Sequence, residues 1–91
     1  MANTRSAKKR MRQNTVRQER NRSRRSAVKT QVRRFLDAVH DKDLPRATQE
    51  YRAVGKILDQ TTAKGTYHKN TTARKKSRLA ARLNALSAAG A

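Results

Sequence analysis

The stretch Asp41-Lys42-Asp43-Leu44-Pro45 decides the fold, because it interrupts a helical pattern that otherwise runs through the first half of the chain. The carboxylate of Asp43 is suited to accept a hydrogen bond from the free backbone N–H groups that begin a helix. Pro45 is tolerated only in the first turn of that helix, since proline lacks the N–H group that later turns require. The stretch therefore predicts the end of one helix and the N-cap of the next.

Apolar residues on both sides of this turn recur at helical spacing. The pattern predicts a first helix from about Ser6 to Val39, whose apolar face consists of Val28, Val32, Phe35, Leu36 and Val39. A second helix is expected to end at Gly65, and its apolar face consists of Leu44, Ala47, Tyr51, Val54, Leu58 and Thr61. A third helix covers roughly residues 68–87 and presents Leu79, Leu83 and Leu86, with Ala73 and Ala80 beside them.

The start of the third helix has two candidate caps, Thr66 and Asn70. No window alternates apolar and polar residues for long enough to predict a strand. The prediction is an all-α fold, an elongated three-helix bundle whose long basic N-terminal helix extends beyond the core. Residues 1–26 are expected to form the basic extension, and residues 27–91 the bundle.

The charge of the chain is large and unevenly distributed. Among 91 residues, 24 are Lys or Arg and 6 are Asp or Glu, which gives a net charge of +18. Residues 1–34 carry 13 − 1 = +12, residues 35–63 carry 4 − 5 = −1, and residues 64–91 carry 7 − 0 = +7. Because such an excess of charge repels itself, it favours a polyanionic partner at both flanks.

The N-terminal segment continues the helical pattern without an apolar face. Counting back from Val28 by three and five helical turns, Arg17 and Arg10 occupy the line that apolar residues hold further along. A helix that is polar on every side is either frayed in water or ordered by a charged ligand. A solvated basic tail and a targeting presequence are the alternatives, although the Leu/Phe stripe of a presequence is missing.

Several kinds of chemistry are excluded or unsupported. The chain has no cysteine, so a disulfide, a thiolate metal site and a cysteine nucleophile are excluded. His40 and His68 are 28 residues apart without a third ligand at metal spacing. No Gly-rich phosphate loop, nucleophile motif or carboxylate pair is present. We expect no enzyme activity, no cofactor, no metal and no small-molecule substrate.

The basic residues suit phosphate contacts, and the aromatic residues are too few for base stacking. The basic region of a leucine-zipper factor is superficially similar to the run of Asn14, Arg17, Arg20, Arg22, Arg24 and Arg25. A zipper is not sustained, however, because the helix ends at Asp41 after about two heptads. A nucleoid-type, nonspecific DNA-binding protein remains the alternative to an RNA-binding protein. A cationic membrane protein is disfavoured by the narrow apolar face of the first helix.

Three motifs resemble a known family. They are Ala2-Asn3-Thr4-Arg5-Ser6-Ala7-Lys8-Lys9-Arg10, Asn21-Arg22-Ser23-Arg24-Arg25-Ser26, and Lys64-Gly65-Thr66-Tyr67-His68-Lys69-Asn70 continuing through Ala73-Arg74-Lys75-Lys76-Ser77-Arg78-Leu79. Over essentially the whole chain they are similar to the bacterial small-subunit ribosomal proteins of the S-twenty family. The resemblance implies a cytoplasmic ribosomal protein bound directly to 16S ribosomal RNA, at its 5′ domain and penultimate stem. It also implies a role in early assembly beside other small-subunit components.

Charge and resemblance together give the predicted RNA-binding residues. In the first helix they are Ser6, Lys8, Lys9, Arg10, Arg12, Arg17, Arg20, Asn21, Ser23, Arg24, Arg25 and Lys29. Around the third helix they are Lys64, His68, Lys69, Asn70, Arg74, Lys75, Lys76, Ser77, Arg78 and Arg82.

Overall fold

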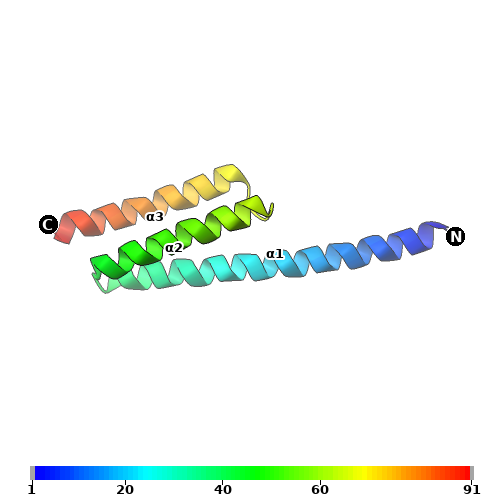
Figure 1. The fold of residues 1–91 in the computed structure, drawn as a ribbon, viewed down its shortest axis with the longest axis horizontal. Coiled ribbons are helices and arrows are strands. Elements are labelled where there is room, and N and C mark those ends of the chain that lie inside the picture. The colour runs from blue at the N-terminus through cyan, green and yellow to red at the C-terminus, as the bar shows by residue number, and fades with distance from the viewer. Residues whose placement is uncertain (1, 91) are drawn as a thin grey trace.

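Three α-helices follow one another in the computed structural model, which describes residues 2–90. They are α1 (Ala2–His40), α2 (Leu44–Ala63) and α3 (Lys69–Gly90), and the described residues contain no strand. α2 runs back along the C-terminal half of α1, and α3 turns again to run beside α2 (Figure 1). The all-α prediction is confirmed, and α1 begins earlier and α3 ends later than the apolar spacing indicated.

α2 is the central helix of the arrangement. It packs against both α1 and α3, whereas α1 and α3 have little contact with each other. The N-terminal half of α1 extends beyond the other two helices, and the two termini lie at opposite ends of the molecule (Figure 1). The result is elongated, with principal dimensions of 70 × 21 × 14 Å.

The turn between α1 and α2 uses the residues that the sequence indicated. The backbone N–H groups of Lys42 and Asp43 donate to the carbonyl oxygens of Val39 (3.1 Å) and Ala38 (3.1 Å), which closes α1 in a Schellman motif. Asp43 Oδ1 then accepts from the backbone N–H of Arg46 at 3.2 Å, and Pro45 lies in the first turn of α2. The predicted N-cap is confirmed.

Lys42 adopts a left-handed backbone conformation in this turn, with φ of 57°. That conformation costs a non-glycine residue about 1–2 kcal/mol, which a glycine at this position would not incur. Glycine loses more conformational freedom on folding, however, and this offsets roughly 0.5–1 kcal/mol of the stabilisation that the substitution brings. We therefore expect Lys42→Gly to stabilise the fold by about 0.5–1 kcal/mol and to raise Tm by roughly 2–8 °C in thermal unfolding. Lys42→Ala is the control: it removes the same charge but keeps the strain, and an equal rise in its Tm would contradict this explanation.

The turn between α2 and α3 ends at a different cap from those expected. Gly65 has φ of 83°, and the N–H groups of Gly65 and Thr66 donate to the carbonyl oxygens of Thr62 (2.9 Å) and Thr61 (3.1 Å). Gly65 thus ends α2 as predicted. Neither Thr66 nor Asn70 caps α3: His68 does, because its Nδ1 accepts from the backbone N–H of Asn70 at 3.1 Å.

The core is small and is centred on α2. Its buried members are Val28, Phe35, Ala38, Ala47, Val54, Leu58 and Leu79. The rings of Phe35 and Tyr51 pack at a centroid distance of 5.9 Å and a tilt of 53°. The predicted apolar faces of all three helices are confirmed, although Ala73 proves exposed and Ala38 is buried without having been indicated.

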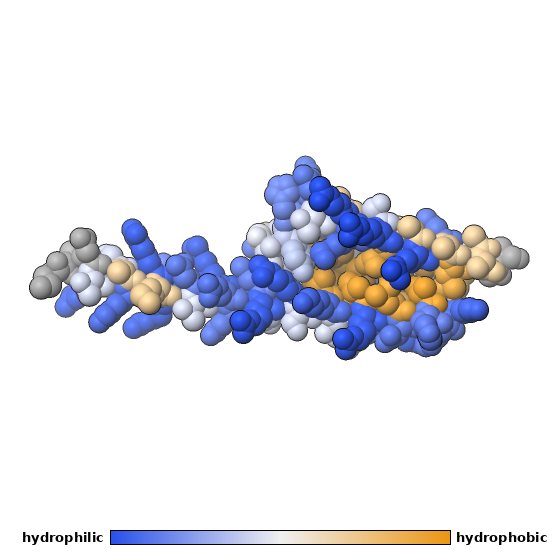
Figure 2. Space-filling view, turned by 180° about the vertical axis from the view of Figure 1, so that it is seen from behind, coloured by the Kyte–Doolittle hydropathy of each residue, from blue (hydrophilic) through white to orange (hydrophobic). Residues whose placement is uncertain are grey.

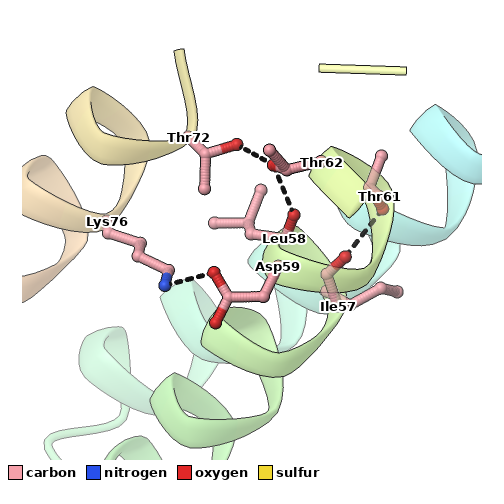
Figure 3. Close-up of polar contacts among 7 residues, drawn as sticks. All are labelled: Ile57, Leu58, Asp59, Thr61, Thr62, Thr72 and Lys76. Atoms are coloured by element: carbon pink, nitrogen blue, oxygen red, sulfur yellow. Dashed lines mark hydrogen bonds and ion pairs between the residues drawn. The ribbon is translucent and has the colours of Figure 1, made fainter. Parts of the chain in front are cut away.

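Polar side chains complete the contact between α2 and α3 (Figure 3). The hydroxyl groups of Thr62 and Thr72 are hydrogen-bonded to each other, and Lys76 Nζ pairs with Asp59 Oδ1. The buried hydroxyl of Thr61 donates to the carbonyl oxygen of Ile57 at 2.7 Å, so its burial leaves no hydroxyl proton unpaired. The Thr62–Thr72 and Lys76–Asp59 contacts thus join α2 to α3 in addition to the apolar packing of Leu79, Leu83 and Leu86.

An apolar surface remains open where α1 and α3 fail to meet. Figure 2 shows it on the half of the molecule that contains all three helices, bordered by hydrophilic side chains. At the end of the molecule near the α1–α2 turn it forms a groove lined by Val39, Lys42, Leu44, Arg82, Ala85, Leu86 and Ala89. On this side of the molecule, half-buried side chains are therefore all that covers the core.

Candidate nucleic-acid interface

The N-terminal half of α1 has no packing partner among the described residues. Every side chain from Thr4 to Arg20 is exposed, including Met11 (68%) and Val16 (40%). The cause lies in the sequence, because no apolar face exists there for another helix to cover. We refer to residues 4–20 as the α1 overhang. It carries its charge as Arg5, Lys8, Lys9, Arg10, Arg12, Arg17 and Arg20 against the single acid Glu19.

A polar cluster marks the point where the overhang meets the bundle. The hydroxyl of Thr66, in the α2–α3 turn, donates to Asn21 Oδ1 on α1 at 2.9 Å. Arg24 Nη1 lies 3.4 Å from both Asn21 Oδ1 and Thr66 Oγ1, within reach of either acceptor. These three half-buried residues, which we call the latch, hold the turn against α1. Sequence reasoning missed this role of Thr66, since a polar contact across 45 residues leaves no periodic signal.

A cleft lies beside the latch, and we call it the junction cleft. It is lined by Arg17, Arg20, Asn21, Arg24, Lys64 and Gly65. Its cations come from two segments that are distant in sequence, α1 and the α2–α3 turn. None of the ion pairs among the described side chains involves these cations, since those pairs join His40 and Arg46 to Asp41, and Lys76 to Asp59.

The basic residues of α3 divide into two groups. Lys75 Nζ lies 5.5 Å from the centre of the Tyr67 ring, a cation–π contact, and Lys76 pairs with Asp59 of α2. Both side chains are half-buried and contribute to the fold. The other cations are exposed and have no acidic partner among the described side chains: Lys69, Arg74, Arg78 and Arg82.

His68 has one ring nitrogen committed and one free for a ligand. Because Nδ1 accepts the Asn70 N–H, the proton of the neutral ring resides on Nε2, where it can be donated. The side chain is exposed at the start of α3. Capping and phosphate contact are therefore compatible roles for this residue.

The structure places all of the predicted RNA-binding residues at the surface. Four are half-buried: Asn21, Arg24, Lys75 and Lys76. The rest are exposed: Ser6, Lys8, Lys9, Arg10, Arg12, Arg17, Arg20, Ser23, Arg25, Lys29, Lys64, His68, Lys69, Asn70, Arg74, Ser77, Arg78 and Arg82. At the junction cleft the fold brings Lys64 of the second predicted cluster beside Arg17, Arg20 and Arg24 of the first. The rest of the overhang and the outer face of α3, by which we mean its exposed cations Lys69, Arg74, Arg78 and Arg82, extend away from the cleft in opposite directions (Figure 1).

Residues 2–90 lack the features of a metal site or a membrane span. No group of three or more His, Cys, Asp or Glu side chains is arranged to hold a metal ion in that range. None of the three helices combines the length and the apolar character needed to cross a membrane. The main feature of the described surface is its positive charge, most of which has no acidic partner. This places the protein in the class of small, basic helical proteins whose surface suits a polyanion.

Comparison with known proteins narrows this class. The family model for Ribosomal protein S20 matches residues 2–84. The small ribosomal subunit protein bS20 of Xylella fastidiosa strain 9a5c is 45% identical over 89 residues, which cover 98% of this chain and 100% of the relative. The protein of the same name from Clostridium botulinum strain Hall is 44% identical over 88 residues, 97% of this chain and 100% of the relative.

The chain belongs to the ribosomal protein S20 family. The resemblance of its three motifs to that family is therefore confirmed. It is a structural ribosomal component of the cytoplasm, as the family resemblance implied, and it is not an enzyme, as the lack of a catalytic motif in the sequence predicted.

Proposed function

We propose that this protein binds 16S ribosomal RNA directly, through phosphate contacts of the α1 overhang and the outer face of α3, and thereby supports assembly of the small subunit. One observation carries the proposal: the overhang is a long, exposed, basic helix that no other described part of the chain covers. Arg and Lys on such a helix match phosphate oxygens in geometry and charge. The names of the relatives, which place those proteins in the small ribosomal subunit, support the choice of RNA.

Two binding regions at a fixed separation supply specificity in this proposal. We assign residues 1–26 to the RNA-binding extension and residues 27–91 to the bundle, which carries the second region on α3. Neither region offers free aromatic rings for reading bases, because Phe35 is buried and Tyr51 and Tyr67 pack against the core. Recognition then depends on RNA shape. The family resemblance points to the 5′ domain and the penultimate stem as the two RNA elements.

Removing residues 1–16 tests the proposal while leaving the latch intact. Affinity for 16S ribosomal RNA is expected to fall by about 100-fold at fixed salt, since five cations are lost, whereas affinity for random RNA of equal length falls by less than about 10-fold. Both affinities are measured by filter binding, and circular dichroism checks that the bundle melts unchanged. Equal losses on both RNAs, or equal affinity of the full chain for duplex DNA, would favour a nonspecific nucleic-acid-binding protein.

A further inference from the structure

We propose that the junction cleft is a composite phosphate site, in which one stretch of RNA backbone lies between α1 and the α2–α3 turn and contacts cations of both. The inference rests on the proposed function, and it adds a specific phosphate-binding site to that function. The phosphate contacts of residues 4–16 and of the outer face of α3 do not need the α2–α3 turn, whereas this cleft exists only when the turn is docked on α1. RNA binding there is consequently coupled to the fold of the bundle.

The geometry of α1 directs three cations into the cleft. Arg17, Arg20 and Arg24 are spaced by three and four residues, so they share one side of the helix. Glu19 lies on a different side, because two residues along a helix correspond to a rotation of about 200°. The one acid in this part of α1 is thus turned away from the arginines that line the cleft.

The opposite wall comes from the α2–α3 turn. Lys64 adds a fourth cation, and the next residue, Gly65, has no side chain. A Cβ built on Gly65 would find nothing within 4 Å, so the space above this backbone is open to a ligand. Thr66, which follows directly, anchors the turn through Asn21.

The convergence of four cations is unfavourable in the chain by itself. Like charges brought together by folding repel one another, and no acidic side chain is paired with them among the described residues. The latch nevertheless holds the two walls in place with hydrogen bonds that a surface turn does not require. An RNA phosphate between the walls would relieve the repulsion and be held by charge-assisted contacts from both sides.

A double-mutant cycle tests whether the two walls act on the same stretch of RNA. Arg17→Gln, Lys64→Gln and the double variant are compared with the full chain for binding to 16S ribosomal RNA at fixed salt. Arg17 and Lys64 are exposed and take no part in the latch, so both variants keep the fold, which circular dichroism verifies. In a shared site the double variant loses about 3–10-fold less affinity than the product of the single losses, because residues that share a partner do not act independently.

Arg10→Gln combined with Lys64→Gln is the matched control, since Arg10 lies seven residues before Arg17 on the same side of α1 and outside the cleft. The loss of affinity in this double variant should equal the product of the two single losses to within about twofold, as expected for separate contacts. If the Arg17–Lys64 losses multiply in the same way, the composite site is overturned while the RNA-binding function stands. Both cycles are also run on random RNA of equal length. If the full chain shows no preference for 16S ribosomal RNA, the proposed function is overturned, and the cycles on random RNA still test whether the cleft is a shared site.

Discussion

The Phe35→Ala variant is expected to lose its cooperative unfolding transition at 25 °C. Phe35 is fully buried and contacts Tyr51 at the centre of a core with seven buried apolar residues among those described. Truncating a buried phenylalanine costs about 3–5 kcal/mol. A core of this size rarely supplies more than about 3–5 kcal/mol of stability in total. The variant should therefore be largely unfolded, with loss of helical signal in circular dichroism and no urea transition.

Met11→Ala is the matched control for this prediction. It also deletes a large apolar side chain from α1, but Met11 is 68% exposed on the overhang and packs against no other helix. Its melting should equal that of the unchanged protein. If Phe35→Ala melts as the control does, the assignment of the core to the α1–α2 contact is wrong.

Affinity for 16S ribosomal RNA is expected to fall by about 10³–10⁵ between roughly 50 and 200 mM salt, on the scale of duplex nucleic acid, if some 6–10 phosphates are neutralised. The physical reason is counterion release, since each phosphate contact frees condensed cations into solution. The exposed cations of the overhang and of α3 are numerous enough to make that number of contacts. Filter binding at several salt concentrations gives the slope of log affinity against log salt.

The slope should respond to where a cation lies. Lys8→Ala with Arg12→Ala removes two cations from one side of the overhang and should reduce the magnitude of the slope by up to about 1.8. Arg46→Ala removes a cation that pairs with Asp41 at 3.1 Å, in the segment with no net positive charge, and should leave the slope unchanged. Equal changes for both variants would mean that binding senses net charge alone.

The sequence predicts much of this fold because its helix signals are local. The Asp43 cap, the placement of Pro45 and the left-handed Gly65 each follow from the preference of one residue for one backbone position. The apolar faces follow from spacing. In the overhang, charged and polar residues stand where an apolar face would have to be. No other helix can therefore pack on it, and its exposure could be predicted.

The remaining features depend on contacts between distant residues. The latch joins Asn21 and Arg24 to Thr66 through hydrogen bonds, which have no preferred sequence spacing. His68 is an uncommon cap, and its role depends on where the first turn of α3 places the backbone N–H of Asn70. The junction cleft is likewise a product of tertiary structure, because its two walls come from the first and last thirds of the chain.

The central position of α2 keeps most contacts of the fold between helices that are neighbours in the sequence. Each helix packs mainly on its neighbour in the sequence, so few contacts require the closure of a long loop. Such topologies fold within microseconds to milliseconds, whereas synthesis of 91 residues takes roughly 5–18 s. Folding of the released chain is therefore much faster than its synthesis. Folding keeps pace with synthesis, and a new copy is ready for RNA almost as soon as it is released.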